Sequence, residues 1–330
     1  MNTVLKTAIL PAGEAAVAAA AHALARGGLV AFPTETVYGL GADATNAAAI
    51  ARLYQAKGRP AFNPLIAHVG DLDAARRIGR FDASALLLAE AFWPGPLTLV
   101  LPKAADCAVA DLATAGLDTV AIRIPAHAIA RDILRAFGRP VVAPSANLSG
   151  HVSPTIAAHV HSDLEGRIDL IVDGGAVAVG VESTIIGIFD QPMLLRPGGL
   201  PRADIERVLG RTLQEPPEDT ESDSGQPLAP GMLASHYAPR TKVRLNADRI
   251  EPGEALLAFG LGAISGIDEA AAVMNLSARG DLDEAAANLF GHLRALDTRA
   301  ARAIAVMPIP EDGLGEAIND RLRRAAVGRE

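Results

Sequence analysis

The sequence is poor in cysteine and in aromatic residues, and it has no long apolar run. A single cysteine among 330 residues excludes an intrachain disulfide and a zinc site built from several thiolates. Aromatic residues make up only 4% of the chain, and alanine supplies much of the apolar content, which favours helices packed closely on a sheet. No apolar run approaches the roughly 18 residues of a membrane-spanning helix, and no basic-then-apolar signal pattern opens the chain. We therefore expect a cytoplasmic protein that does not enter membranes.

The remaining composition is that of a folded protein with more than one domain. Half of the residues are hydrophobic and 21% are charged, which excludes a disordered chain. A length of 330 residues is long for one domain and comfortable for two. The net charge of -8 argues against general affinity for nucleic acids, although it permits a local basic cleft.

A change in composition divides the chain. Residues 215–235 contain five acidic and no basic side chains and are rich in proline and serine, as is typical of a linker. We predict a first domain over residues 1–212, a linker over 213–239 and a second domain over 240–330.

Strand and helix patterns alternate in both predicted domains, which indicates an α/β fold. In the first domain, helices are expected over residues 14–26, 47–56 (with Asn46 as the N-cap) and 84–92. Strands are expected over residues 29–32, 65–69, 97–101, 120–124, 141–142, 170–172, 185–189 and 193–195, the last two as a hairpin. They predict a twisted, mixed sheet. In the second domain, strands near residues 243, 256–259, 272–274 and 303–307 and helices over 282–296 and 314–324 predict a small Rossmann-like three-layer unit.

A short basic loop is the most informative local feature. Lys57 and Arg59 stand at the end of a helical pattern, and Pro60 and Pro64 stiffen the backbone around Asn63. Such a loop can direct two positive charges and an amide into one pocket, as a polyphosphate requires. The alternative is a solvated helix C-terminus, where basic residues favour the negative end of the helix dipole.

Other polar residues follow or interrupt apolar strands. Ser145 and Asn147 lie on a turn after a strand and could bind a nucleotide, or could simply cap a helix. Arg123 lies between two isoleucines in a strand. Because an unpaired buried guanidinium is costly, it should face solvent, an anion or a structural aspartate. The same expectation applies to Arg196, which follows another apolar strand.

Five motifs, in this order, resemble the YrdC-type family, most closely its longer, two-domain threonylcarbamoyl-AMP synthases. They are Phe32–Gly41, Lys57–Pro60, Trp93–Thr98, Pro144–Gly150 and Leu195–Gly199. Together they cover the first domain, and Pro230–Met232 with His236–Pro239 extends the resemblance into the linker.

The resemblance implies a nucleotidyltransferase, an L-threonylcarbamoyladenylate synthase. This activity joins L-threonine, bicarbonate and ATP into threonylcarbamoyl-AMP and releases pyrophosphate and water. It is the first step of the threonylcarbamoyladenosine modification of tRNA. The resemblance further implies Mg²⁺ with the ATP, transfer of the product to a tRNA threonylcarbamoyl transferase complex, and compatibility with a contact to RNA.

The resemblance also assigns roles to residues. Lys57 and Arg59 are the expected catalytic cations. ATP would be bound by Lys57, Arg59, Asn63, Thr119, Ser145, Asn147, Ser153, Arg196 and Tyr237. L-Threonine would be bound by Thr36, His68, Arg123, Ala143 and Ser183. Tyr237 would come from the linker and act as a lid that excludes water. No side chain is assigned to a metal, and none stands out as a covalent nucleophile, so catalysis would rest on positioning and electrostatics.

Two other functions are compatible with parts of this pattern. A carbamoyl-adenylate-forming enzyme of the hydrogenase-maturation kind shares the fold, but such proteins carry cysteine-rich zinc motifs that this chain lacks. An RNA-binding module is the non-enzymatic alternative, and a steep salt dependence of RNA affinity would identify it. The sequence leaves open the role of the second domain, the oligomeric state, the transferase partners and the choice between bicarbonate and carbon dioxide.

Overall fold

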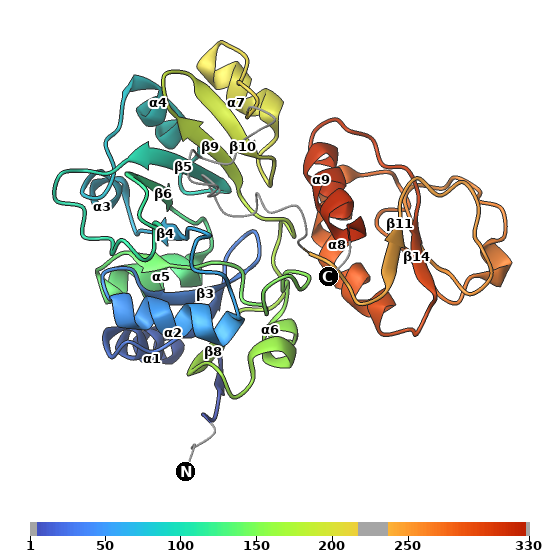
Figure 1. Cartoon of the computed structure of the whole chain (residues 1–330), viewed down its shortest axis with the longest axis horizontal. Helices are drawn as coiled ribbons and strands as arrows, with labels where there is room; N and C mark the ends of the chain where they lie inside the picture. Colours follow the sequence, from blue (N-terminus) through green and yellow to red (C-terminus); the bar gives the residue numbers. More distant parts are fainter. Residues whose placement is uncertain (1–4, 217–236, 328–330) are drawn as a thin grey trace.

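The computed structural model describes residues 5–216 and 237–327, which form two α/β units (Figure 1). Within these residues, a mixed sheet of ten strands builds the first unit and a parallel sheet of four strands builds the second. No helix in the described ranges combines the length and the apolar character that crossing a bilayer requires.

The large sheet has the strand order β1-β8-β2-β3-β7-β4-β6-β5-β9-β10. Its strands are β1 (Ala8–Pro11), β2 (Val30–Pro33), β3 (Tyr38–Asp43), β4 (Ile66–His68), β5 (Leu97–Pro102), β6 (Thr119–Arg123), β7 (Val141–Val142), β8 (Leu170–Asp173), β9 (Thr184–Ile188) and β10 (Pro192–Arg196). Parallel pairs such as β4–β6 and antiparallel pairs such as β9–β10 both occur, so the mixed sheet predicted from the sequence is confirmed.

Helices cover the two faces of this sheet unequally. On one face lie α1 (Glu14–Ala25) and α5 (Ala128–Phe137), whose apolar residues pack on β2, β7 and β8. The cluster on the other face includes α2 (Ala47–Lys57), α3 (Leu72–Arg76), α4 (Ala83–Phe92), α6 (Ala157–Leu164) and α7 (Arg202–Leu209). Alternate residues of β4, β5, β6 and β9 feed this second layer, as the period of a strand requires.

The intervening residues of these strands point to the face that carries α1 and α5, but they do not contact those two helices. There a small cluster forms over five neighbouring strands and contains no helical residue among those described. Its members are Ile66, Val100, Ala121, Ile185 and Leu195. No helix of the described residues therefore covers this part of the sheet.

Most of the predicted elements agree with the structure. The side chain of Asn46 accepts hydrogen bonds from the amides of Ala48 and Ala49 and caps α2 as expected. The predicted hairpin is the antiparallel pair β9–β10. The sequence analysis missed β1, β3 and the helices α3, α5, α6 and α7. In β3, glycines interrupt the apolar pattern of a strand. Gly41 is needed there because a Cβ atom at this position would lie 2.7 Å from the Phe32 ring.

The second unit has the strand order β11-β14-β12-β13, all parallel. Its strands are β11 (Lys242–Arg244), β12 (Ala255–Ala258), β13 (Val273–Asn275) and β14 (Ala303–Val306). The helices α8 (Leu282–Asp297) and α9 (Gly315–Ala326) pack on one face. Loops, one of which carries the 3-10 helix η1 (Ile267–Glu269), cover the other face. The unit is thus Rossmann-like, and its third layer is thin.

The two units pack tightly against each other. Val37, Val152 and Val181 from loops of the first unit join the same apolar cluster as α8 and α9. A Cβ atom at Gly180 would lie 2.3 Å from the carbonyl oxygen of Ala286, so the backbone of α8 touches this loop. Most of the linker predicted over 213–239 lies outside the described residues, and the domain boundaries stay a prediction.

Candidate active site

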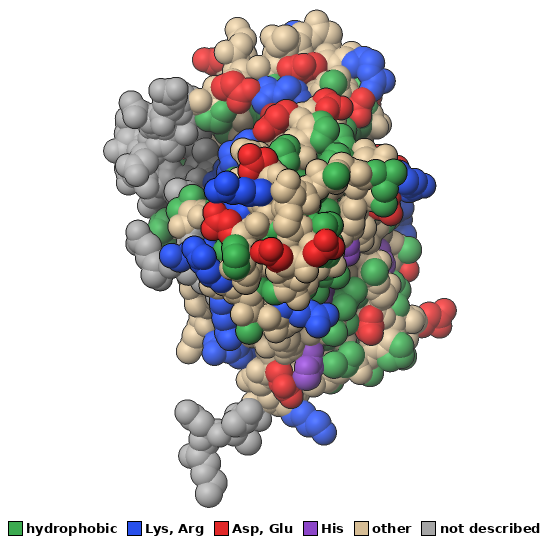
Figure 2. Space-filling model, turned by 90° about the vertical axis from the view of Figure 1, so that its right-hand side faces the viewer, with side chains coloured by type: hydrophobic (Ala, Val, Ile, Leu, Met, Phe, Trp, Pro, Cys, Tyr) green, Lys and Arg blue, Asp and Glu red, His purple; other side chains and the backbone are tan. Residues whose placement is uncertain are grey.

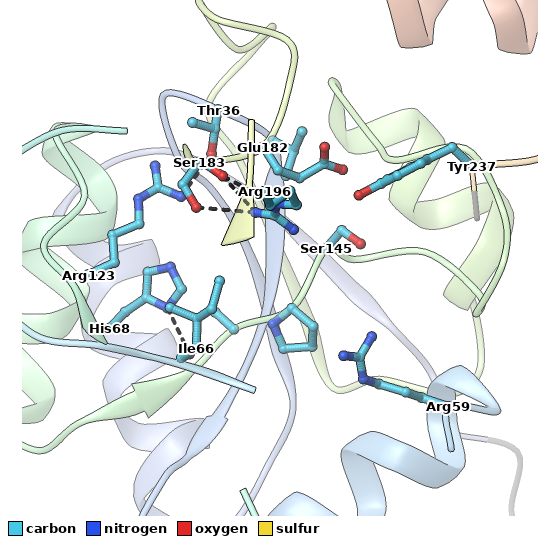
Figure 3. A pocket seen from close by; sticks show the side chains of 13 residues that line it. Thr36, Arg59, Ile66, His68, Arg123, Ser145, Glu182, Ser183, Arg196 and Tyr237 are labelled. Atoms are coloured by element: carbon cyan, nitrogen blue, oxygen red, sulfur yellow. Dashed lines mark hydrogen bonds between the residues drawn. The ribbon is translucent and has the colours of Figure 1, made fainter. Parts of the chain in front are cut away.

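A pocket opens over the uncovered part of the sheet (Figure 3). It is lined by Thr36, Val37, Arg59, Ile66, His68, Arg123, Ala143, Pro144, Ser145, Glu182, Ser183, Arg196 and Tyr237. In the close-up, Arg123 and His68 lie at one end and Arg59 and Tyr237 at the other, with Arg196 between them. The lining combines several cations with hydroxyl groups, which suits a ligand with more than one anionic group.

The sheet register builds the first end of the pocket. His68 and Arg123 are direct partners across the parallel pair β4–β6, so their side chains stand next to each other. Arg123 donates to Thr36 Oγ1 at 2.9 Å, to Glu35 Oε1 at 2.7 Å and to the carbonyl oxygen of Gly95 at 3.2 Å. The partner of this buried guanidinium is thus Glu35 and not the aspartate considered from the sequence.

Burial sets the protonation of this end. Burial, followed by the charge of Arg123, lowers the pKa of His68 to about 3, so the ring is neutral at physiological pH. Burial alone would raise the pKa of Glu35, but the charge of Arg123 and its hydrogen bond bring it below the usual value. The end therefore holds a neutral imidazole beside a compensated arginine.

The end of α2 builds the second end of the pocket. Gly58 adopts a left-handed conformation (φ 61°), which ends the helix and turns Arg59 inward. Arg59 donates to the carbonyl oxygen of Pro64 at 3.1 Å, while its buried Nε has no partner among the described residues. Burial lowers its pKa to about 10, and the nearby Arg196 contributes to this shift. A buried donor without a partner is expected where a ligand binds.

Lys57 lies behind the pocket and does not line it. Its ammonium donates to the carbonyl oxygens of Ser145 and Asn147, so it fixes the turn that carries both residues. Burial, followed by repulsion from Arg59, lowers its pKa well below the usual value. Asn63 and Asn147 are also buried, and the Oδ1 of each lacks a partner among the described residues. These orphaned oxygens again point to an absent ligand.

Arg196 and Ser183 lie in the centre. A register shift between Leu194 and Arg196 in β10 pairs Arg196 with Ile185 of β9. Arg196 donates to the carbonyl oxygen of Ser183 at 2.8 Å and to its Oγ at 3.3 Å. Ser183 Oγ also lies 2.8 Å from Thr98 Oγ1. The hydroxyl of Ser183 is therefore held at the pocket wall.

The sequence analysis missed Glu182, which belongs to the pocket wall. It is the one carboxylate among the described lining residues. Ser153, one of the predicted ATP-binding residues, does not line the pocket. Its hydroxyl instead donates to Glu182 Oε1 at 2.5 Å. The residues Val181–Thr184 read as an ordinary strand start, and nothing in their pattern marks the glutamate.

The structure brings most of the predicted site residues together. Those that line the pocket are Thr36, Arg59, His68, Arg123, Ala143, Ser145, Ser183, Arg196 and Tyr237. Those that do not are Lys57, Asn63, Asn147, Ser153 and Thr119. Thr119 begins β6 and, by the strand period, shares the face of Ala121 and Arg123, at the far end of the open sheet surface.

The pocket offers no protein cage for a metal ion. Within residues 5–216 and 237–327, no three His, Cys, Asp or Glu side chains gather in a way that could hold one. Glu182 already accepts hydrogen bonds from Ser153 and Arg321. A Mg²⁺ ion would therefore have to arrive with its phosphate ligands.

Two family models together span most of the chain. Residues 22–198 match the model for the Sua5, YciO and YrdC proteins, described as telomere recombination. Residues 200–327 match the model described as the threonylcarbamoyl-AMP synthase C-terminal domain. The matches define the class as a two-domain protein with a YrdC-type first unit.

Relatives agree over the full length. The chain is 41% identical to the threonylcarbamoyl-AMP synthase of Bacillus subtilis, over 97% of this chain and 95% of the relative. It is 44% identical to the Pyrococcus abyssi protein of the same name, over 93% of each. The crystal structure of P. abyssi Sua5 with L-threonine matches with a TM-score of 0.86 and 39% identity, over 98% of both chains. This chain belongs to the threonylcarbamoyl-AMP synthase family, as the motifs predicted.

Proposed function

We propose that the pocket joins L-threonine, bicarbonate and ATP into threonylcarbamoyl-AMP and releases pyrophosphate and water. One observation carries this proposal: a single cavity holds Arg123 and His68 at one end and Arg59 at the other, with Arg196 between. This arrangement suits an amino-acid carboxylate beside a nucleotide triphosphate. Binding the two substrates side by side would bring the carbamate on the threonine amine to the α-phosphorus that it attacks.

L-Threonine would lie at the Arg123 end. The guanidinium of Arg123 would bind the substrate carboxylate in addition to Glu35 and Thr36. The neutral ring of His68 and the hydroxyl of Ser183 are suited to the polar groups of threonine. Ala143 contributes a small wall that leaves room for the substrate backbone.

ATP would extend from the centre toward Arg59. Arg59 and Arg196 would contact the phosphates, with Lys57 holding the turn of Ser145 and Asn147 in place behind them. The buried Oδ1 atoms of Asn63 and Asn147, which lack a partner among the described residues, are acceptors and would suit hydroxyl or amino groups of the nucleotide. Thr119 and Ser153 would contribute from farther along the nucleotide, and Tyr237 would cover it.

The chemistry follows from this placement. The threonine amine takes up bicarbonate and loses water, which gives a carbamate. A carbamate oxygen attacks the α-phosphorus, a new P–O bond forms, and the bond to the β-phosphate oxygen breaks with its electrons leaving on pyrophosphate. Arg59 and Arg196 would stabilise the charge that develops on the phosphates. Mg²⁺ bound to the ATP would balance part of the phosphate charge.

A nearby apolar wall would protect the product. Tyr237 is buried, lies in the lining and stacks on Phe290 of α8 at 5.5 Å between ring centroids. Such a cover limits hydrolysis of a labile adenylate. We propose that the product then passes to a tRNA threonylcarbamoyl transferase.

Direct binding of RNA has less support on the face shown in Figure 2. There Lys and Arg side chains alternate with Asp and Glu, with no continuous basic surface. Phosphate-backbone binding relies on such a surface.

One incubation tests the proposal. The protein is mixed with MgATP, radiolabelled bicarbonate and each amino acid in turn. We expect a labelled adenylate only in the mixture that contains L-threonine, and one pyrophosphate released for each adenylate formed. Product formation from carbamoyl phosphate without an amino acid would instead identify a carbamoyl-adenylate former. Salt-sensitive RNA binding without pyrophosphate release would identify the RNA-binding module.

A further inference from the structure

A carboxylate stands in the wall of a pocket that must accept a triphosphate. Glu182 lines the cavity and is only 7% exposed. Burial alone would raise its pKa, but Arg321 and Arg196 lower it below the usual value, so Glu182 carries its charge. A buried negative charge at this position repels phosphate groups unless a cation compensates it.

The compensating cation comes from the second domain. Arg321 lies on α9 and is fully buried. Its Nε donates to Glu182 Oε2 at 2.8 Å, and its Nη1 donates to the carbonyl oxygen of Pro197 at 2.9 Å and to Asp320 of its own helix at 2.6 Å. Glu182 and Pro197 belong to the first domain, and Pro197 directly follows Arg196 of the pocket wall. One side chain of α9 is thus bonded to two segments of the ATP site.

The same guanidinium also supports the cover of the pocket. Its Cζ lies 5.3 Å from the ring centroid of Tyr237, in a cation–π contact. The Tyr237 ring thus contacts both the guanidinium of Arg321 on α9 and the ring of Phe290 on α8. The position of Tyr237 therefore depends on two helices of the second domain.

Other ion pairs between the domains do not reach the pocket. Arg202 of α7 pairs with Glu316 of α9 at 2.6 Å, and Arg294 of α8 pairs with Asp163 of α6 at 2.9 Å. None of these four residues lines the cavity. The pair Arg321–Glu182 differs from them because one of its members is part of the pocket wall.

We propose that Arg321 is a positioning residue of the ATP site, which neutralises Glu182 and holds Tyr237 over the nucleotide. The inference rests on the proposed function and gives the second domain a role in it. The first domain then binds ATP tightly only when α9 is docked against it. Loss of Arg321 removes the ion-pair partner of Glu182 and leaves the carboxylate with only the field of Arg196 and the hydroxyl of Ser153 beside the phosphates.

The test compares three variants of the full chain with the wild type. Arg321→Gln removes the cation, Glu182→Gln/Arg321→Gln removes both charges, and Arg202→Gln breaks an interdomain pair away from the pocket. We measure the dissociation constant of MgATP by calorimetry and the KM for ATP and for L-threonine. Circular dichroism and thermal unfolding verify that each variant is folded.

We expect Arg321→Gln to weaken ATP binding by about tenfold or more, because a buried charge loses its partner. The KM for ATP should rise more than the KM for L-threonine. The double variant should recover most of the ATP affinity, since Glu182 is no longer charged and Asp320, which also pairs with Arg321, keeps Arg324 as a partner. Arg202→Gln should stay within about twofold of the wild type, as a partly exposed pair contributes little.

Two outcomes would overturn the inference while leaving the proposed function intact. One is wild-type ATP affinity in Arg321→Gln. The other is a double variant as weak as Arg321→Gln, which would indicate a purely structural arginine. If Arg321→Gln does not fold, Glu182→Gln is compared with the double variant, and a further loss beyond about tenfold contradicts the charge argument. A wild-type protein that forms no adenylate contradicts the proposed function itself.

Discussion

Single residues of the pocket differ in how they are held, and this decides what each substitution should do. Arg59 reaches the pocket from the end of a helix, and its Nε finds no partner in the described part of the chain. Arg123 is bonded to Glu35, Thr36 and Gly95. The first is arranged for a ligand, whereas the second also organises the pocket wall.

Replacing Arg59 should affect turnover far more than stability. Arg59→Ala should lower kcat by about 10²–10³, the usual cost of removing one preorganised group that stabilises transition-state charge. Pyrophosphate release measures this effect. Arg52→Ala is the matched control, because Arg52 lies on the same helix but pairs with Asp169 at the surface. Equal activity of the two variants would contradict the phosphate assignment.

His68 should make stability depend on acid pH. Its pKa is about 3 in the folded protein against 6.5 for a free histidine. Below pH 6.5 the unfolded chain therefore binds a proton that the folded protein excludes, and stability falls as the pH decreases toward 3. Relative to His68→Gln, the wild type should lose about 1.4 kcal/mol per pH unit between about pH 5.5 and 4.5. Urea unfolding at each pH measures this difference. If the unfolding free energies of the wild type and His68→Gln changed in parallel with pH, the prediction would be refuted.

The sequence was informative for residues whose type is unusual in its context. Arg123 between isoleucines and the Lys57–Arg59 pair were recognised because buried cations are rare. Glu182 was not recognised, since its reason for being buried is Arg321, which lies 139 positions away. The distinction between Arg59 in the lining and Lys57 behind it also depends on how α2 ends, which is a matter of tertiary packing.

At the scale of elements, local signals and packing contributed differently. The N-cap Asn46 and the turn between β9 and β10 are encoded by neighbouring residues, and both were predicted. The strand β3 was not, because its glycines are required by close tertiary contacts, Gly41 with Phe32 and Gly39 with Ala143. Strand order could not be derived either, since β8 lies between β1 and β2 although it follows them by more than a hundred residues.

The loop before β9 should tolerate no side chain at Gly180. Gly180 and Gly175 have nearly the same backbone conformation, with φ angles of +82° and +80°. A Cβ at Gly175 would meet nothing within 4 Å, whereas at Gly180 it would collide with the backbone of α8. Gly175→Ala should therefore cost about 1 kcal/mol of unfolding free energy, from backbone strain alone. Gly180→Ala should cost about 2 kcal/mol more, because the helix must move.

Urea unfolding of the two glycine variants separates strain from collision. Equal losses of stability would show that α8 does not press on this loop.

At the scale of the whole molecule, the interface between the domains combines apolar contacts with ion pairs. Val37, Val152 and Val181 pack with α8 and α9, and ion pairs such as Arg202–Glu316 and Arg294–Asp163 also join the domains. The sequence predicted two domains but not this interface, because the contacts join residues that are distant in the chain. Sequence patterns reveal which face of an element is apolar, but not which partner covers it.

Breaking one of these ion pairs should weaken the whole protein. Arg294 donates to Asp163 at 2.9 Å and to the carbonyl oxygen of Val152. Arg294→Met should lower the unfolding free energy by about 3 kcal/mol at neutral pH, since Asp163 is left buried without its arginine partner. Arg202→Met, in a more exposed pair, should cost less than about 1 kcal/mol.

The pH dependence gives this prediction a second measurement. Burial alone would raise the pKa of Asp163, but hydrogen bonds from His151 and Arg294 lower it to about 2, from 3.8. The pair therefore stabilises the protein fully above pH 3.8, and its contribution is lost as the pH falls through about 2. The difference between wild type and Arg294→Met should shrink over that range, and a constant difference would contradict the ion pair.

The place of Arg321 in the chain has a consequence for biosynthesis. Domains generally fold in order as the ribosome extends the chain, so the ten-stranded sheet can form while α9 is still untranslated. Until that helix emerges, Glu182 lacks its ion-pair partner Arg321, and the proposed ATP site is incomplete. Fragments that end before α9 should then form the large sheet but hold ATP weakly.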